Sequence, residues 1–207
     1  IMSELLAEKR TMQPAVARKT VGLDPGQPTV LLMGGSGGIL SYVDFIRDIS
    51  AAMASHTVRP IQFIAMCGRN EKVKLELETW TGLPANARLK TYGFISDFAA
   101  AKILQESADL IVSKPGGLTT FELLTSRRPV IFTQGIGIQE IHNARFSEAE
   151  GASVYVQTGL VGAKAAELLT DNTARAAQVY NQDRLQAEFQ LQHIVEWARS
   201  AEVRQHS

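Results

Sequence analysis

The sequence has one cysteine, Cys67, among its 207 residues, so it has no internal disulfide framework. This excludes the small secreted domains that disulfides hold together, and it is typical of a reducing cytoplasm. Long hydrophobic runs are also lacking, because the longest, such as 30–33 and 61–67, have the length of a strand. We therefore expect neither a signal peptide nor a transmembrane helix.

An excess of charge of either sign is lacking too, since 21 Lys and Arg balance 21 Asp and Glu. A neutral chain creates no field that attracts nucleic acid, so no nucleic-acid partner is expected. The histidines, His56, His142, His193 and His206, do not have the spacing of metal ligands, and Cys67 stands alone. We therefore expect no metal site. Gly-x-x-x-x-Gly-Lys-Ser/Thr and Gly-x-Ser-x-Gly, which mark nucleoside triphosphatases and hydrolases, do not occur.

What the sequence does have is an alternation of short apolar runs with amphipathic segments. Each apolar run is continuous, as in the strands of a parallel sheet that is covered on both faces. The pattern predicts an α/β protein with a Rossmann-like, doubly wound parallel sheet. The expected strands are 29–33, 61–66, 89–92, 110–112, 130–132 and 152–156, and the expected helices are 38–56, 71–80, 98–105, 121–125, 141–150 and 163–169.

The most informative stretch is 113–143, in which an apolar run gives way to Gly116 and Gly117 and then to a helix. Glycine lets the backbone approach an anion closely, and a helix start presents unpaired N–H groups to it. We expect Gly116, Gly117 and the Thr119 hydroxyl to hold a diphosphate. Lys114 is either an added charge for this anion or a surface residue.

Glu122 follows Thr119 by three residues, which is the spacing of a capping box. Because a carboxylate offers two fixed acceptor oxygens, Glu122 also suits the two hydroxyls of a ribose, and the surrounding loops favour that role. An earlier glycine loop contains Gly35, Ser36 and Gly37 and is expected to open a helix and bind phosphate. Its alternative is a tight turn that only the fold requires, since the dinucleotide pattern Gly-x-Gly-x-x-Gly is incomplete.

Three further segments follow strands. Gln139 and Glu140 form an amide-acid pair that can select sugar hydroxyls by hydrogen bonds, or an exposed helix start. Asn143 is expected to buttress that loop. A base can lie against the Phe94–Ile95 segment and bond to its backbone, the alternative being that Phe94 packs in the core. Arg69 faces either the nucleotide or solvent.

In their order along the chain, these motifs make it similar to the C-terminal, donor-binding half of two-domain (GT-B) glycosyltransferases. The group that it resembles contains monogalactosyldiacylglycerol synthases, processive diacylglycerol glucosyltransferases and the GlcNAc transferase that makes lipid II. The resemblance covers 29–156, and the segments that carry it are LLMGGSGG, MCGRN, YGFISD, SKPGGLTTFELL and GIQEIHNA.

The resemblance implies a UDP-sugar as substrate, with no cofactor and no metal, and inverting transfer of a hexose to a lipid acceptor such as diacylglycerol. It also implies a cytoplasmic location and leaves open a peripheral contact with a membrane. The donor-binding residues that it implies are Gly35, Ser36, Gly37, Arg69, Phe94, Ile95, Gly116, Gly117, Thr119, Glu122, Gln139 and Glu140.

In this family the N-terminal domain binds the acceptor and supplies the general base, so the catalytic residues are expected outside this chain. The unusual start, Ile1-Met2, is consistent with a piece of a longer protein. The expected organisation is a solvated helix and linker in 1–28, a sugar-nucleotide-binding domain in 29–170 and C-terminal helices in 171–207. In the last stretch the expected packing residues are Val179, Phe189, Ile194 and Trp197.

Two alternatives stay open. In the first, the chain is a donor-binding subunit that needs a separate acceptor-domain partner. In the second, it is a non-catalytic sugar-nucleotide-binding module. A nicotinamide-binding domain is disfavoured, because the second strand ends in Met66 and Cys67 and not in an acid for the ribose.

Overall fold

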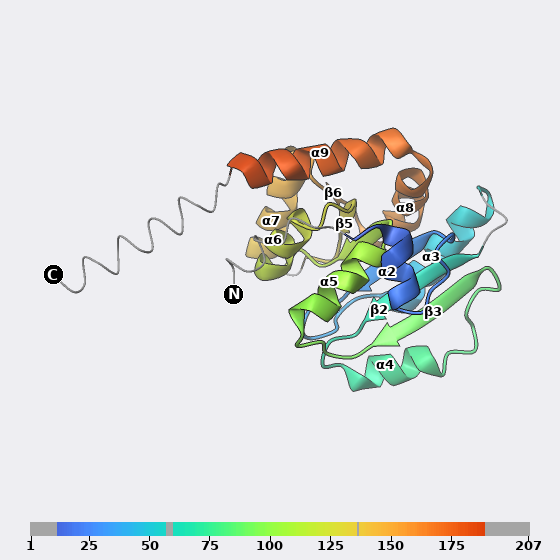
Figure 1. Ribbon diagram of the computed structural model, residues 1–207. Helices are drawn as coiled ribbons and strands as arrows, with labels where there is room; N and C mark the ends of the chain where they lie inside the picture. Colours follow the sequence, from blue (N-terminus) through green and yellow to red (C-terminus); the bar gives the residue numbers. More distant parts are fainter. Residues whose placement is uncertain (1–11, 57–59, 136, 189–207) are drawn as a thin grey trace.

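The computed structural model describes residues 12–56, 60–135 and 137–188. Its strands are β1 (Thr29–Met33), β2 (Ile61–Met66), β3 (Ala87–Tyr92), β4 (Leu110–Ser113), β5 (Val130–Phe132) and β6 (Val154–Tyr155). They form one parallel sheet in the order β3-β2-β1-β4-β5-β6 (Figure 1). The chain winds outward from β1 to β3 and then crosses back to β4, so the winding reverses between β1 and β4. Ligands of doubly wound sheets bind at that point, outside the carboxyl ends of the strands.

Helices cover both faces of the sheet. They are α2 (Pro14–Thr20), α3 (Tyr42–Ala54), α4 (Glu71–Glu78), α5 (Phe98–Ser107), α6 (Gly117–Leu124), α7 (Ile138–Ala149), the 3₁₀ turn η1 (Thr158–Leu160), α8 (Val161–Thr170) and α9 (Asn172–Glu188). One core cluster packs α3, α4 and α8 against the sheet, and a second packs α5, α6 and α7 against the opposite face. The predicted α/β class and Rossmann-like topology are therefore confirmed.

The continuous apolar runs of the sequence have a direct cause in this arrangement. Along β1, Leu32 belongs to the first cluster and Leu31 to the second, and both are fully buried. Successive side chains of a strand point to opposite faces, so a strand covered on both sides is apolar at most of its positions. Each such side chain stabilises the fold by about 1.5–3 kcal/mol.

Three helix starts differ from the expected positions by three or four residues. The helix expected from residue 38 begins at Tyr42, so residues 39–41 separate it from the first glycine loop. The reason is local: Gly35 and Gly38 have φ of +69° and +59°, which an α-helix does not contain. In the other direction, α6 begins at Gly117 rather than 121, and α7 begins at Ile138 rather than 141. The first turns of these two helices contain glycine and polar residues, so the apolar periodicity did not extend to the true helix starts.

Helix α2 is tied to the sheet by a buried arginine, so the prediction of a solvated N-terminal helix is wrong at this position. Arg18 is 6% exposed, donates to the carbonyls of Ser107 (2.9 Å) and Pro25 (3.0 Å), and pairs with Asp109 at 2.6 Å. Asp109 also accepts the backbone N–H of Thr29 at 2.8 Å. The arginine thereby links α2 to the starts of β1 and β4, the two strands at which the winding reverses.

Two glutamines of α9 form hydrogen bonds to backbone groups near β5 and β6. Gln178 accepts the N–H of Val130 at 2.9 Å, and Gln182 donates to the carbonyls of Arg128 (2.8 Å) and Ala152 (3.0 Å). Val179, which was expected to pack, is half-buried. The other expected packing residues, Phe189, Ile194 and Trp197, lie outside the described residues.

Candidate functional site

The glycine loop after β1 is shaped by contact with the loop after β2. A Cβ on Gly38 would lie 1.8 Å from the Cys67 carbonyl oxygen, and a Cβ on Gly68 would lie 2.5 Å from the Ser36 carbonyl oxygen. The N–H of Arg69 donates to that same Ser36 oxygen at 2.9 Å. The two backbones thus approach more closely than any side chain permits, and the loop has a fixed shape at the carboxyl end of β1. Gly68 was not singled out from the sequence.

The second glycine loop leads directly into a helix. Gly116 is the N-cap of α6, so Thr119 is the third residue of the helix. A capping box between Thr119 and Glu122 is therefore not formed. A Cβ on Gly116 or Gly117 would have its nearest neighbours at 3.9 Å, so packing within the chain does not require either glycine. This backbone is instead open to a ligand, and the helix start carries a positive partial charge.

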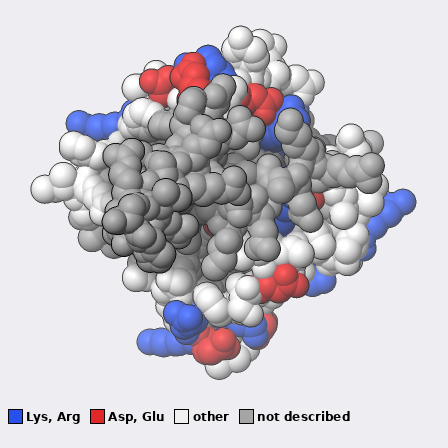
Figure 2. All heavy atoms as spheres, turned by 60° about the vertical axis from the view of Figure 1, so that its left-hand side comes forward, with Lys and Arg blue, Asp and Glu red and all other residues white. Residues whose placement is uncertain are grey.

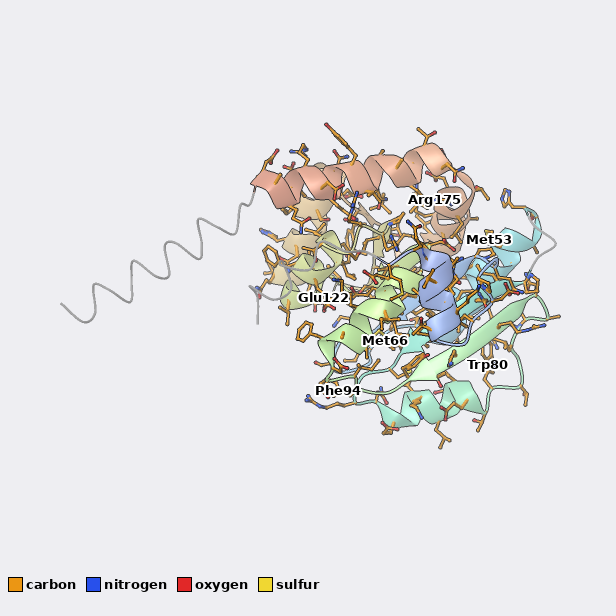
Figure 3. The ribbon with its side chains drawn as sticks, viewed as in Figure 1. Met53, Met66, Trp80, Phe94, Glu122 and Arg175 are labelled. Carbon is orange, nitrogen blue, oxygen red and sulfur yellow. The ribbon has the colours of Figure 1, made fainter. Side chains whose placement is uncertain are left out.

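Two adjoining cavities lie at these loops. The larger has a volume of 430 Å³ and the smaller 270 Å³, and both are lined by Gly35, Ser36, Leu118 and Thr119, so they form one cleft. The larger cavity is also lined by Glu122 from α6, Met66 from β2 and Phe94 from the segment after β3 (Figure 3). Around the rim of the face that Figure 2 turns forward, where described residues are visible, Lys and Arg side chains lie beside Asp and Glu side chains.

The structure brings most of the predicted site residues to this cleft. The larger cavity is lined by Gly35, Ser36, Phe94, Ile95, Thr119 and Glu122. The smaller cavity is lined by Gly35, Ser36, Gly37, Gly116, Gly117, Thr119 and Glu140. Two predicted residues lie beside the cleft without lining it. Arg69 stacks on Phe94, and the Gln139 amide nitrogen is 3.9 Å from the position of a Cβ on Gly117.

Glu122 is a half-buried carboxylate in the larger cavity. Burial raises its pKa, and a hydrogen bond donated by Gln105 Nε2 to Glu122 Oε1 lowers it in part. Gln105 is only 5% exposed and lies on α5. Sequence reasoning missed Gln105 because 17 residues separate it from Glu122, and no local pattern connects them.

The segment after β5 is held by polar contacts to the second glycine loop. Asn143 donates to the carbonyl of Pro115 at 3.1 Å, so this bond holds the second glycine loop and not the loop of Gln139 and Glu140 that Asn143 was expected to buttress. Lys114 pairs with Glu140 at 3.2 Å, and both side chains line the smaller cavity. Lys114 is therefore not a solvated surface residue, since its side chain is 16% exposed.

Phe94 is 48% exposed, so its packing in the core is excluded. The Arg69 guanidinium lies 4.2 Å from the centre of the Phe94 ring. A contact of this kind contributes about 0.5–1 kcal/mol at an exposed site. It places the Arg69 guanidinium beside an aromatic ring that lines the larger cavity.

Gln134 was also missed from the sequence. It follows β5 with φ of +55°, which is uncommon for a residue with a side chain. Its amide accepts the N–H of Ser41 at 3.2 Å and donates to the Ser41 hydroxyl at 2.6 Å. Because Ser41 is the N-cap of α3, Gln134 links the segment after β5 to the end of the first glycine loop. Strained backbone of this kind is concentrated at functional sites.

Neither a metal centre nor a membrane span is found in the described part of the chain. Within residues 12–56, 60–135 and 137–188, three or more His, Cys, Asp or Glu side chains do not gather in a way that could hold a metal ion. The helices in these ranges are too short or too polar to cross a bilayer.

The fold belongs to a known class, that of the GT-B glycosyltransferases. MurG of Acinetobacter baumannii is similar with a TM-score of 0.62 and 21% identity, over 95% of this chain and 55% of that one. VinC, a glycosyltransferase solved with dTDP, has a TM-score of 0.59 and 20% identity, over 93% and 45% of the two chains. At these identities the likeness shows the fold.

The sequence places the chain within this class. Residues 29–197 match the glycosyltransferase family 28 C-terminal domain, and the chain belongs to that family. It is 32% identical over 134 residues to a processive diacylglycerol beta-glucosyltransferase of Bacillus licheniformis, across 65% of this chain. It spans only 33% of the length of that relative, and 36% of the counterpart from Staphylococcus carnosus. The resemblance predicted from the motifs is confirmed.

Proposed function

We propose that this chain is the donor-binding half of an inverting glycosyltransferase that moves a hexose from a UDP-sugar to a lipid acceptor such as diacylglycerol. The observation that carries the proposal is the convergence of two glycine loops, the start of α6 and the Glu122 carboxylate on one cleft. The cleft lies where doubly wound sheets bind nucleotides. Lipid glycosylation is named in the relatives, and a bound nucleoside diphosphate in the structural neighbour VinC.

The proposed donor pose follows the cleft from end to end. The diphosphate lies over Ser36 and the 116–117 pair, and the ribose hydroxyls bond to Glu122. The base lies against the Phe94–Ile95 segment, and the sugar meets the side chains at 139–140. As the bond to the sugar breaks, negative charge develops on the UDP oxygens. The start of α6 is fixed beforehand and stabilises that charge.

We further propose that the catalytic base and the acceptor site lie outside this chain, and that the chain needs no metal or cofactor. It would then bind the donor and transfer little by itself. Leu118 and Ile138 support this, because they are 65% and 79% exposed, and Leu118 lines the cleft. An acceptor domain would cover such side chains, whether it belongs to the same polypeptide or to a separate subunit. The lipid acceptor favours a cytoplasmic location with peripheral contact at the membrane.

The donor is tested by a thermal-shift panel of UDP, GDP, ADP, UDP-sugars and NAD. A ligand present at a hundred times its dissociation constant stabilises the folded chain by about 2.7 kcal/mol, which raises the melting temperature of a domain this size by roughly 5–10 °C. We expect this shift with UDP and UDP-sugars only. A shift with NAD, or with none of the ligands, would contradict the proposal. Sugar release from a UDP-sugar by the chain alone would contradict the placement of the base elsewhere.

A further inference from the structure

Among the described residues, Gln105 is the buried glutamine that bonds to a side chain of the cleft. Gln62, Gln178 and Gln182 are also buried, and each of them bonds backbone groups near the ends of strands. Gln105 instead donates to the Glu122 carboxylate.

Gln105 is one of several buried residues of α5. The others are Ala101, Leu104, Glu106 and Ser107, and the Gln105 side chain is 5% exposed. Burying an amide costs free energy unless its polar atoms find partners, so packing alone would be served at lower cost by an apolar side chain. The Gln105 amide has such a partner in the Glu122 carboxylate.

The hydrogen bond from Gln105 restricts the orientation of the Glu122 carboxylate. A carboxylate has two oxygens with about four acceptor positions, and Gln105 takes one of them at Oε1. The remaining positions can accept two hydroxyls. Burial raises the pKa of Glu122, and the amide donor opposes that rise, which favours the charged acceptor form. A group that is already oriented loses less freedom when a ligand binds.

We propose that Gln105 is a positioning residue, which holds the Glu122 carboxylate in the orientation that accepts both hydroxyls of a ribose. This inference rests on the proposed function, because it requires a nucleoside diphosphate with its ribose at Glu122. Gln105 lines neither cavity, so we expect it to act through Glu122 without touching the ligand.

The test measures the preference of the whole chain for UDP over 2′,3′-dideoxy-UDP by calorimetry. The two ligands differ only in the hydroxyls assigned to Glu122. We expect the unmodified chain to bind UDP on the order of tenfold more tightly. Gln105→Met keeps the length of the side chain and removes the donor, and Gln105→Glu keeps its shape and sets a second carboxylate against Glu122. Both variants should lose most of the preference and leave the affinity for the dideoxy ligand unchanged.

Gln178→Met is the matched control, because it also removes a buried glutamine, but one that bonds the backbone N–H of Val130 away from the cleft. It should lower the melting temperature and retain the preference for UDP. A preference that survives in both Gln105 variants would overturn the inference alone. An unmodified chain that binds both ligands equally would overturn it together with the ribose role of Glu122. An unmodified chain that binds neither ligand would refute the proposed function itself.

Discussion

Glu122→Ala is expected to weaken UDP binding by at least on the order of tenfold to a hundredfold, since even one hydrogen bond to a charged group contributes about 1.5–3 kcal/mol. The carboxylate is the acidic group among the residues that line the larger cavity, and its replacement leaves the ribose hydroxyls without an acceptor. Calorimetric titration with UDP measures the loss.

The matched control is Glu76→Ala, which removes an exposed carboxylate from α4. Its UDP affinity should equal that of the unmodified chain. Circular dichroism should show both variants folded. An unchanged dissociation constant in Glu122→Ala would rule out the ribose role of this residue.

The same carboxylate gives UDP binding a pH dependence. Burial raises the pKa of Glu122, so protonation begins at a higher pH than for an exposed glutamate. A protonated carboxyl group accepts hydrogen bonds poorly, and the affinity should therefore fall as the pH is lowered through that raised pKa. The fall should be smaller in Glu122→Ala, which keeps only the protonation of the UDP phosphate, and calorimetric titration at a series of pH values measures the difference.

Arg18→Met is expected to lower the free energy of unfolding by about 2–4 kcal/mol, which corresponds to a melting temperature lower by roughly 4–16 °C. The substitution removes two hydrogen bonds to carbonyls and the partner of Asp109. Methionine keeps most of the apolar stem, so the effect reports the lost polar contacts. Urea unfolding measures it.

Arg127→Met provides the comparison, because Arg127 pairs with Asp183 at 2.9 Å with 48% and 40% of the two side chains exposed. An exposed pair contributes about 0–1 kcal/mol. Equal effects of the two substitutions would show that burial of Arg18 adds nothing to the stability of the fold.

The parts of the fold that followed from the sequence are those with a local cause. Strands β1, β2 and β5 were predicted with their observed bounds, because burial on both faces makes most positions of a strand apolar. The glycine loops were recognised for a similar reason, since a close approach of backbone to backbone or to a ligand restricts the residue type at one position.

The parts that did not follow depend on contacts between distant segments. Gln105 and Glu122 meet only after α5 and α6 have packed on the same face of the sheet. Arg18 stands in a segment with the composition of a solvated helix, and only the folded chain brings Asp109 to it. Gln134 has a positive φ that nothing in its own sequence requires. Such pairings are fixed by tertiary structure and have no signature within a short window.

The strand order also determines how the protein behaves at high concentration. Its outermost strands are β3 and β6, and an unpaired strand edge is a template for aggregation. β6 has only two residues, and β3 carries Arg88 and Lys90, whose charges oppose the docking of another strand. Lys90 also reaches the carbonyl of Val21 at 2.5 Å. A short strand at one edge and two basic side chains at the other therefore oppose the extension of the sheet from one molecule to the next.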